Sequence, residues 1–389
     1  MSTAVIQLAS GDVEAFGFGH GNTQRSESFC RAVDQAAATL DAGGLVAFPT
    51  ETVYGVAARA DLPDALEKLR LVKSRQDNRP FTVHIGSPSD AAKFVPEVKG
   101  VASRLVRKGW PGPLTLILAV DDPFSAPVMA NLEASVAAGM YFEGTIGLRC
   151  PDDPVAERIL RLTRGPVVAS SANAAGTAAP RCGGDVLRDL DGRIDLLIDG
   201  GNTKYAKPST IVRVDGSWYT ITREGVLDAG IIERMAKLRI LLVCTGNTCR
   251  SPMAEGIAGM MLAAQFGCGV DELAGRGVEV RSAGTSGGDG CGAAPYAISV
   301  TARRGIDLSG HVSKGLTADM VHQADVIFTM TRSHRTCVLD LVPSAQERVF
   351  LLLGERDVQD PVGGSEEEYE ECAKVIEEGL TIRLQEVIL

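Results

Sequence analysis

The stretch LLVCTGNTCRSPMAEG, residues 241–256, ends an apolar run with Cys244 and places Arg250 six positions later. The backbone N–H groups of such a short loop, together with the start of a following helix, can surround a phosphate-sized dianion and favour the thiolate form of a cysteine. The planar guanidinium of Arg250 can hold two phosphoryl oxygens at once. A C-x5-R pattern also arises by chance, and free cysteines are often simply buried. Its setting between a strand and a helix nevertheless indicates a thiol that attacks phosphorus.

The elements on either side must position this loop. RILLV is almost continuously apolar, which is typical of a strand buried on both faces of a parallel sheet. Ser251 suits a helix N-cap, Pro252 the first helical position, and the following MAEGIAGMMLAAQ has helical periodicity. A leaving group also needs a proton donor, and Asp360, in a loop just before a charged helix, is the candidate.

Four ordered motifs of the second half form a recognisable set: LLVCTGNTCRSPMAEG, VRSAGTSG, ADVIFTMTRSH and QDPVGGSEEEY. Over residues 238–389 this set resembles the low-molecular-weight phosphotyrosine phosphatase family, whose domain has a parallel-sheet α/β fold. The resemblance implies that Cys244 forms a phosphocysteine intermediate, that Arg250 clamps the transition state, and that Asp360 serves first as general acid and then as base. It assigns supporting positions around the phosphate to Thr245, Gly246, Asn247, Thr248, Cys249, Ser251 and Ser282.

Two details of that half concern substrate choice and oxidation. Thr248 stands where phosphotyrosine enzymes of the family usually have Ile or Leu, and CTGNTCRSP is similar to the protein arginine phosphatases. Val362, Gly363 and Gly364 replace the aromatic residues that often follow Asp-Pro, although the arginine phosphatases usually have Phe at position 362. We therefore favour phosphoarginine, with phosphotyrosine as the alternative. Cys249 is a candidate for a reversible disulfide with Cys244, or for packing alone.

The first half contains a different set of polar residues at strand ends. A helix over LPDALEKLRLVKSR delivers Lys73 and Arg75 near the segment PTETVYG, and two cations at a strand-lined pocket suit a polyphosphate. Ser171 and Asn173, at the end of the apolar strand VVASSAN, can hydrogen-bond to phosphate or ribose. A solvated helix end and ordinary turn chemistry explain the same residues without a ligand.

The blocks PTETVYG, KSR, RPFTVHI, WPGPLTLIL, SSAN and DGGNTKYAKPSTIV occur in this order. Over about residues 30–227 they resemble the YrdC-like threonylcarbamoyl-AMP synthases, nucleotidyltransferases with a twisted mixed-sheet α/β fold. The resemblance implies condensation of threonine, bicarbonate and ATP, with Mg²⁺ held mainly by the ATP phosphates and no protein metal site. It places Lys73, Arg75, Ser171 and Asn173 around ATP, with Ser209 and Thr210 on a second nucleotide-side turn. Thr50, Thr52, Tyr54 and Arg149 fall in the threonine and substrate pocket.

The resemblance leaves alternatives open. Some YrdC-like domains only bind RNA, and Arg104, Arg107 and Lys108 beside Trp110 are candidate RNA contacts, or a solvated helix face. The first hypothesis, which we favour, is a bifunctional enzyme with both activities. The second is a phosphotyrosine phosphatase whose first domain only binds RNA. The third is a synthase with a silent phosphatase domain.

Composition sets the frame for these readings. The chain has 389 residues, 45% of them hydrophobic, a net charge of −10 and nine cysteines without C-x-x-C pairs, which favours a cytoplasmic protein with free thiols. No membrane span or signal peptide is expected. We predict an extension (1–29), a synthase domain (30–228), a short helical joint (229–237) and a phosphatase domain (238–389). Expected partners are a phosphoprotein, the small-molecule substrates, and tRNA or tRNA-modification proteins.

Overall fold

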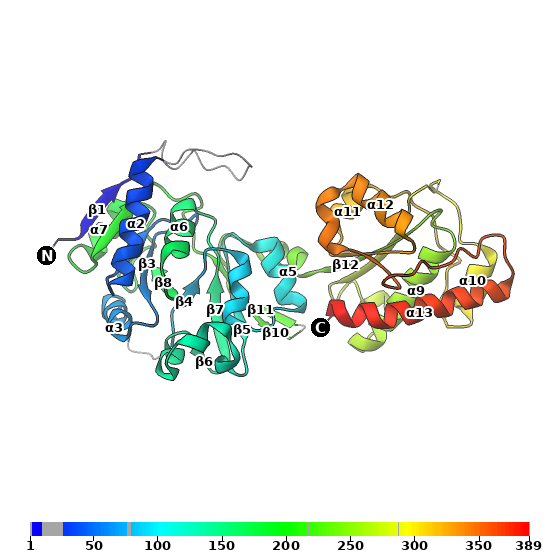
Figure 1. Ribbon diagram of the computed structural model, residues 1–389, viewed down its shortest axis with the longest axis horizontal. Helices are drawn as coiled ribbons and strands as arrows, with labels where there is room; N and C mark the ends of the chain where they lie inside the picture. The colour runs from blue at the N-terminus through cyan, green and yellow to red at the C-terminus, as the bar shows by residue number, and fades with distance from the viewer. Residues whose placement is uncertain (1, 10–25, 76–78, 217, 287, 389) are drawn as a thin grey trace. The chain divides into compact units, whose positions relative to one another are not determined.

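The structure, a computed structural model, describes residues 2–9, 26–75, 79–216, 218–286 and 288–388. The chain folds into two compact units, Met1–Met235 and Ala236–Leu389 (Figure 1). Each unit has its own sheet and its own helices.

The amino-terminal unit is built on one mixed sheet with strand order β1-β9-β2-β3-β8-β4-β7-β5-β10-β11, and β6 pairs with β7. The sheet contains both parallel pairs, such as β4 with β7, and antiparallel pairs, such as β3 with β8. This confirms the predicted mixed α/β sheet. The strands are β1 Ala4–Gln7, β2 Val46–Phe48, β3 Gly55–Arg59, β4 Thr82–His84, β5 Leu114–Ala119, β6 Tyr141–Phe142, β7 Thr145–Arg149, β8 Val167–Ser171, β9 Leu196–Asp199, β10 Thr210–Asp215 and β11 Trp218–Arg223.

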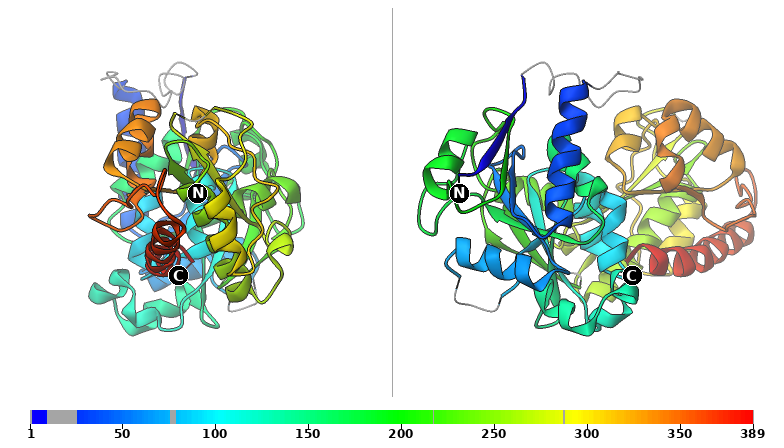
Figure 2. Two further views of the ribbon diagram at one scale, coloured as in Figure 1. Left: turned by 90° about the vertical axis from the view of Figure 1, so that its right-hand side faces the viewer. Right: turned by 60° about the vertical axis from the view of Figure 1, so that its left-hand side comes forward.

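Helices α2 (Glu27–Asp41) and α6 (Pro154–Leu162) pack against each other and run side by side over one face of this sheet (Figure 2). Their buried side chains form one cluster with residues of β2, β3, β8 and β9, because apolar residues recur at helical spacing along α2. The other helices of this unit are α3 Pro63–Val72, α4 Ala91–Phe94, α5 Gly100–Gly109, α7 Gly183–Leu190 and α8 Ala229–Ala236, with short 3-10 turns at Pro88–Asp90, Pro123–Ser125, Pro127–Asn131 and Ala134–Gly139.

Two segments bear on the predicted domain limits. Ala4–Gln7, predicted to lie in an extension, instead forms strand β1 and pairs in parallel with β9, so the sheet begins earlier in the chain than expected. Periodicity could not show this because four residues are too few to reveal an alternating pattern. The stretch predicted as a helical joint contains α8.

The carboxy-terminal unit has a four-stranded parallel sheet in the order β13-β12-β14-β15, which confirms the predicted parallel α/β fold. Its strands are β12 Leu238–Cys244, β13 Val278–Gly284, β14 Val326–Thr329 and β15 Val349–Leu351. Its helices are α9 Arg250–Phe266, α10 Pro295–Ala302, α11 Ala318–Gln323, α12 Arg332–Leu341 and α13 Glu366–Ile388, with 3-10 turns at Val270–Glu272 and Pro343–Arg348.

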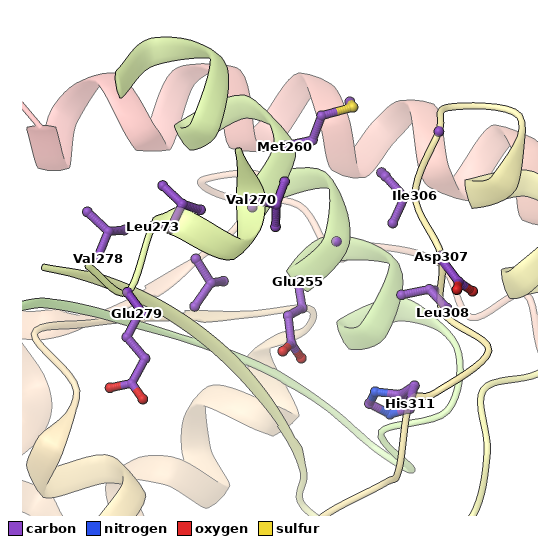
Figure 3. A pocket seen from close by; sticks show the side chains of 15 residues that line it. Glu255, Met260, Val270, Leu273, Val278, Glu279, Ile306, Asp307, Leu308 and His311 are labelled. Carbon is purple, nitrogen blue, oxygen red and sulfur yellow. The ribbon is translucent and has the colours of Figure 1, made fainter. Parts of the chain in front are cut away.

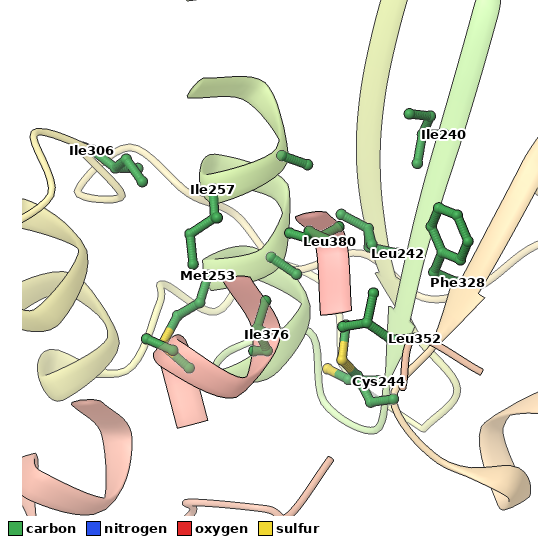
Figure 4. Close-up of a cluster of buried hydrophobic side chains, with 14 of the residues drawn as sticks. Ile240, Leu242, Cys244, Met253, Ile257, Ile306, Phe328, Leu352, Ile376 and Leu380 are labelled. Atoms are coloured by element: carbon green, nitrogen blue, oxygen red, sulfur yellow. The ribbon is translucent and has the colours of Figure 1, made fainter. Parts of the chain in front are cut away.

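Strand β12 is buried on both faces, as its apolar run predicts. Ile240, Leu242 and Cys244 join a cluster with α9, α10 and α13, which Figure 4 shows from close by. Leu241 and Val243 point to the opposite face and join a second cluster with α11 and α12. The alternation of a strand therefore carries Cys244 to the α9 side of the sheet.

Among the helices that the structure describes, none combines the length and the apolar composition needed to cross a membrane.

Candidate active sites

Cys244 ends β12, and the loop of residues 245–249 leads directly into α9. Its thiol is 2% exposed. The backbone N–H of Asn247 lies 3.2 Å from the Cys244 Sγ, and the Ser251 hydroxyl lies 3.0 Å from the same sulfur. Asn247 adopts φ of 55°, a left-handed conformation that Asn tolerates better than most residues and that turns its N–H toward the sulfur. The loop is thus folded around the thiol.

The start of α9 differs from the prediction. The helix begins at Arg250 with Cys249 at the N-cap position, so Ser251 and Pro252 lie inside the first turn. The Ser251 hydroxyl does not cap a backbone N–H, because it bonds instead to the Cys244 sulfur and accepts from the Asn247 side chain at 2.9 Å.

Asn247 ties the loop to the rest of the unit. Its Nδ2 also donates to the Ser282 hydroxyl at 2.8 Å, and its Oδ1 accepts from the backbone N–H of Lys314 at 2.8 Å. Ser282 in turn donates to the carboxylate of Glu255. The structure thus brings Asn247, Ser251 and Ser282 together beside the thiol, and adds Glu255, which the sequence analysis did not name.

Gly284 explains how closely the next strand approaches the loop. A Cβ atom at this position would lie 2.6 Å from the carbonyl oxygen of Thr245 and 3.0 Å from the Asn247 nitrogen. Only glycine leaves room for β13 to pass this near the backbone of the loop.

Arg250 is 4% exposed and is fixed from three sides. Its guanidinium donates to the carbonyl oxygen of Val358 at 3.1 Å, to the Thr245 hydroxyl at 3.1 Å, and to the carboxylate of Asp360. Arg250, from the same motif as Cys244, and Asp360, from a distant one, therefore meet beside the loop that folds around Cys244. The Asp360 side chain is 41% exposed, which leaves it accessible to a substrate.

His334, on α12, is a neighbour that sequence reasoning missed. One ring nitrogen lies 2.9 Å from the Thr245 hydroxyl and the other 2.9 Å from the Thr331 hydroxyl. Burial, reinforced by the positive charge of Arg250, lowers the pKa of His334 to about 4. A neutral imidazole therefore orients Thr245, and Thr245 accepts from Arg250. Only the ADVIFTMTRSH motif pointed toward this segment.

The residues expected to govern specificity lie near the loop surface. Thr248 is partly buried, its carbonyl accepts from the backbone of Ala294 at 2.8 Å, and its hydroxyl lies 3.6 Å from the Cys249 sulfur. Cys249 is buried and lies 3.2 Å from the Tyr369 hydroxyl of α13, another partner that was not foreseen. Val362 is 67% exposed next to Asp360. Gly246 is partly buried between Thr245 and Asn247.

In the amino-terminal unit, the Lys73 ammonium lies at the end of α3 and is 8% exposed. It donates to the carbonyl oxygens of Ser171 at 2.7 Å and Asn173 at 2.6 Å, and to the Asn173 Oδ1 at 3.1 Å. The Ser171 hydroxyl donates to the same Oδ1 at 2.6 Å. Burial, followed by the repulsion of Arg75, lowers the pKa of Lys73 to about 8.

Arg75 leaves the helix in another direction. Ser74 between the two cations has φ of 49°, and Arg75 stacks over the Phe81 ring with 4.8 Å from guanidinium carbon to ring centre. The structure therefore brings Lys73, Ser171 and Asn173 together directly, and holds Arg75 beside them on an aromatic face.

Arg149 ends β7 and organises a second group. Its guanidinium donates to the hydroxyls of Thr52 at 2.6 Å and Thr50 at 3.3 Å, and to Glu51 at 2.9 Å. The Arg149 and Glu51 side chains are 7% and 1% exposed. The Nε of Arg149 is buried without a hydrogen-bond acceptor among the described residues, so one donor stays available for an anionic group. Glu51 was not predicted, although it stands between the two threonines.

Tyr54 connects the two groups. Its hydroxyl is within hydrogen-bond distance of the Asp199 carboxylate and of the Gly201 carbonyl oxygen. Its backbone carbonyl accepts from the N–H of Ala172, the residue between Ser171 and Asn173. Burial raises the pKa of Tyr54. Its ring is fully buried, so Tyr54 fixes the loop of residues 49–54 rather than presenting a free hydroxyl.

Ser209 belongs to a third cluster, beside Arg149 on the sheet. Its hydroxyl lies 2.9 Å from the Thr115 hydroxyl and 3.2 Å from the guanidinium of Arg223. Thr115 is the register partner of Arg149. Burial and then the charge of Arg149 lower the pKa of Arg223, so two cations lie close together. The adjacent Thr210 instead bonds its hydroxyl to the Leu227 carbonyl at 2.6 Å.

The candidate RNA contact is weakened by Trp110. Its side chain is 6% exposed, and its indole nitrogen donates to the Leu114 carbonyl at 2.7 Å. A base cannot stack on a ring that is already buried. The cations Arg104, Arg107 and Lys108 lie on α5, directly before this residue.

Within the part of the chain that the structure describes, no three His, Cys, Asp or Glu side chains lie together so that they could hold a metal ion. The donors around Lys73 and Arg149 are ammonium, guanidinium, hydroxyl and amide groups, which suit phosphate and carboxylate oxygens.

Comparison with known proteins matches each unit separately. A family model named Sua5_yciO_yrdC, described as telomere recombination, matches residues 38–225. A second model, described as low molecular weight phosphotyrosine protein phosphatase, matches residues 239–388. The two resemblances expected from the motifs are thereby confirmed.

Individual relatives agree. The chain is 37% identical over 202 residues to the threonylcarbamoyl-AMP synthase of Bacillus subtilis, covering 52% of this chain and 55% of that protein. It is 31% identical to a putative threonylcarbamoyl-AMP synthase of Mycobacterium tuberculosis, covering 54% of this chain and 91% of the relative. The solved structure of the YwlE arginine phosphatase from Geobacillus stearothermophilus is 31% identical, with 38% of this chain and 94% of that chain covered at a TM-score of 0.34. The chain thus spans little more than half the length of the Bacillus subtilis synthase.

Proposed function

The chain belongs to two families, and from this premise we propose that it is a bifunctional enzyme. Its amino-terminal unit belongs to the Sua5-YciO-YrdC family, and its carboxy-terminal unit to the low molecular weight phosphotyrosine protein phosphatase family. One unit makes threonylcarbamoyl-AMP from threonine, bicarbonate and ATP, and the other removes phosphate from proteins through a phosphocysteine.

The observation that carries the phosphatase proposal is the meeting of Cys244, Arg250 and Asp360 at one loop. The Cys244 thiolate attacks phosphorus, and the negative charge that develops on the phosphoryl oxygens is held by loop N–H groups and by Arg250. The bond from phosphorus to the leaving atom breaks, and Asp360 gives its proton to that atom. The products of this step are a dephosphorylated protein and an S-phosphorylated Cys244.

The second step returns the enzyme to its starting state. Asp360, now a carboxylate, takes a proton from water as the water oxygen attacks the phosphocysteine. The bond from sulfur to phosphorus breaks, and the leaving thiolate is stabilised by the Ser251 hydroxyl and the Asn247 N–H, the two groups that already contact this sulfur. Inorganic phosphate is released.

The preferred substrate of this proposal is phosphoarginine. Thr248 has a hydroxyl at a position where an aliphatic side chain would suit the ring of phosphotyrosine. Val362 and the two glycines after it place no aromatic side chain directly after Asp360 and Pro361. The similarity to an arginine phosphatase supports this choice. The family description names phosphotyrosine, which stays the second candidate.

The synthase proposal rests on the immobilised Lys73. Its ammonium is held at the carbonyls of Ser171 and Asn173, and with Arg75 it supplies positive charge for the ATP phosphates. Thr50, Thr52 and Arg149 form the candidate pocket for threonine, whose carboxylate suits the free Nε of Arg149. Ser209, beside Thr115 and Arg223, supplies a further set of donors for the nucleotide.

The reaction transfers the adenylyl group to a carbamate. The threonine amine and bicarbonate condense to an N-carboxylated threonine with release of water. An oxygen of this carbamate then attacks the α-phosphorus of ATP, and pyrophosphate leaves. Lys73 and Arg75 neutralise the charge that develops on the phosphates. Mg²⁺ accompanies ATP and supplies further neutralisation through phosphate oxygens and water. The product serves modification of tRNA, so tRNA or proteins of that modification are the expected partners, and the cytoplasm is the expected compartment.

A reciprocal pair of variants in the full chain tests the whole proposal. Lys73→Ala should abolish formation of threonylcarbamoyl-AMP and leave phosphopeptide hydrolysis intact, whereas Cys244→Ser should do the opposite. If Lys73→Ala still made threonylcarbamoyl-AMP, the assignment of the first unit would be refuted. If Cys244→Ser still hydrolysed phosphopeptides, the assignment of the second unit would be refuted. Absence of any synthase product from the unmodified chain would favour an RNA-binding role for the first unit, and absence of hydrolysis would favour a silent second unit.

A further inference from the structure

A cavity of about 480 Å³ lies in the phosphatase unit beside α9, apart from the Arg250–Asp360 pair. Figure 3 shows its side chains arriving from α9, from the 3-10 turn Val270–Glu272, from β13 and from the segment that follows α10. Most of its lining is apolar, and the larger of these side chains include Met260, Val270, Leu273, Val278, Ile306 and Leu308. The volume lies within the range of small-molecule sites in proteins.

The polar lining of the cavity is acidic. Three carboxylates, those of Glu255, Glu279 and Asp307, line it together with the single imidazole of His311. Glu279 pairs with Arg239 and Arg281. Glu255 accepts from the Ser282 hydroxyl and Asp307 from the Ser309 backbone N–H, which are neutral donors and leave both negative charges in place. An apolar wall with two such charges complements a cation that carries an apolar body.

Two of the polar lining residues also hold the catalytic loop. Glu255 connects through Ser282 to the Asn247 side chain, and from there to Ser251 and the Cys244 sulfur. His311 reaches the same residue from the other side, with its Nε2 2.8 Å from the Asn247 carbonyl oxygen. In Figure 3 the Glu255 carboxylate and the His311 ring are drawn at the lower side of the cavity. Both contacts therefore converge on Asn247.

We propose that this cavity is a regulatory site for a compact organic cation with an apolar body, and that its occupation is transmitted to Cys244 through Asn247. The cation pairs with Glu255 and Asp307 while its body covers the apolar wall. Pairing draws the Glu255 carboxylate away from Ser282, and this loosens the Asn247 side chain that orients Ser251 and the thiol. The inference rests on the proposed phosphatase function for its biological meaning, but the binding site stands on the cavity alone.

Binding is tested on the full chain with three probes of one shape: tryptamine (cation), tryptophol (neutral) and indole-3-acetate (anion). Methionine methyl groups are labelled for NMR, because the thioether of Met260 lines the cavity. Tryptamine should shift the Met260 methyl signal and bind at least tenfold more tightly than indole-3-acetate. Inorganic phosphate, which is expected to bind at the catalytic loop, should not compete for the cavity, and should change tryptamine affinity by no more than the coupling between the two sites, about fivefold. Equal binding of the three probes, or no shift at Met260, overturns the site.

Val270→Lys supplies the blocking variant. Val270 is 54% exposed and lines the cavity, so a lysine there adds a positive charge at its wall without unfolding the core. Leu341→Lys on α12 is the matched control, because Leu341 is 44% exposed, does not line the cavity and receives the same charge. Tryptamine binding should weaken at least tenfold in Val270→Lys and stay unchanged in Leu341→Lys. The reverse result, or an equal loss in both, contradicts the assignment of the cavity.

Transmission to the thiol is read without turnover, from the rate at which iodoacetate alkylates Cys244, followed by peptide mass spectrometry. Saturating tryptamine should slow this rate about fivefold in the unmodified chain, a coupling of ordinary size, and not in Val270→Lys. An unchanged or faster rate with tryptamine bound refutes the transmission. Neither measurement uses a phosphorylated substrate. If the chain had no phosphatase activity, the proposed function would be refuted, but these two measurements would still test the cation site and its effect on Cys244.

Discussion

Arg250 donates to the carboxylate of Asp360, 110 residues further along the chain. The arginine side chain is 4% exposed and the aspartate 41%, so the pair joins a buried cation to a carboxylate that faces solvent. The same guanidinium is the group proposed to hold the phosphoryl oxygens. A phosphorylated substrate must therefore compete with Asp360 for Arg250, and the released carboxyl group becomes free to act on the leaving atom.

The first prediction follows from this competition. Asp360→Asn removes the proton donor, and turnover of phosphopeptides should fall by about 10² to 10⁴. The same change removes the negative partner of Arg250, so inorganic phosphate should inhibit the variant at a lower concentration than it inhibits the unmodified chain. Steady-state kinetics with phosphate as competitive inhibitor measure both effects. Weaker phosphate binding in the variant would show that the ion pair assists binding, contrary to this account.

The second prediction concerns Thr248. In the unmodified full chain, a phosphoarginine peptide should be hydrolysed with a higher kcat/KM than the phosphotyrosine peptide of the same sequence. Thr248→Ile should reverse this order and change the ratio of the two kcat/KM values by about one to two powers of ten. The aliphatic side chain suits the aromatic ring, and the hydroxyl that could bond to the guanidinium is lost. Thr285→Ile, just outside the loop, is a matched control that should leave the ratio unchanged. A phosphotyrosine preference in the unmodified chain would refute the phosphoarginine proposal.

The third prediction concerns the neighbour of Thr248. The Tyr369 hydroxyl lies 3.2 Å from the Cys249 sulfur, and we expect this contact to slow the oxidation of the thiol. Tyr369→Phe frees the sulfur while keeping the ring, which packs edge-on against Tyr296. A disulfide between Cys244 and Cys249 should then form several-fold faster in dilute hydrogen peroxide, as measured by thiol trapping. Tyr296→Phe is the control, and equal rates in all three proteins would contradict a guarding role for Tyr369.

That residues 245–249 form a loop around the Cys244 thiol could be predicted from sequence because the pattern is local. Cys244, Asn247, Arg250 and Ser251 lie within eight residues, and the spacing itself encodes a loop around a thiol. The helix start was placed too late because Ser251 resembles an N-cap, and no local pattern reveals that its hydroxyl bonds to Cys244 instead.

The partners that support the loop could not be predicted in the same way. Tyr369 reaches Cys249 across 120 residues and His334 reaches Thr245 across 89, and such contacts depend on how strands and helices stack. In the other unit, Glu51 stands inside a recognised block, but its pairing with Arg149 requires β7 to lie beside the loop that follows β2. Ala4–Gln7 was missed because its pairing with β9 is equally distant in sequence.

The fourth prediction tests the buried pair of Glu51 and Arg149. Glu51→Gln leaves the charge of Arg149 without its carboxylate, and should destabilise the amino-terminal unit by about 3 kcal/mol. Both tryptophans of the chain lie in this unit, so denaturant unfolding followed by tryptophan fluorescence reports on it within the full chain. Glu97→Gln, which removes an exposed partner of Lys99, should cost well under 1 kcal/mol. Equal effects of the two changes would show that the buried pair contributes no more than a surface pair.

The fifth prediction uses the pKa of Lys73, which burial and Arg75 lower to about 8. Above pH 8 the lysine of the free enzyme loses its proton, whereas ATP favours the charged form. ATP affinity should therefore be constant below pH 8 and fall up to tenfold per pH unit above it, with proton uptake on binding. Calorimetry at pH 9 in two buffers of different ionisation enthalpy measures that uptake. In Lys73→Arg the charge persists, so ATP affinity should stay flat from pH 7 to pH 9.5. A decline with the same slope in this variant would assign the pH dependence to another group and leave Lys73 without a role in binding the phosphates.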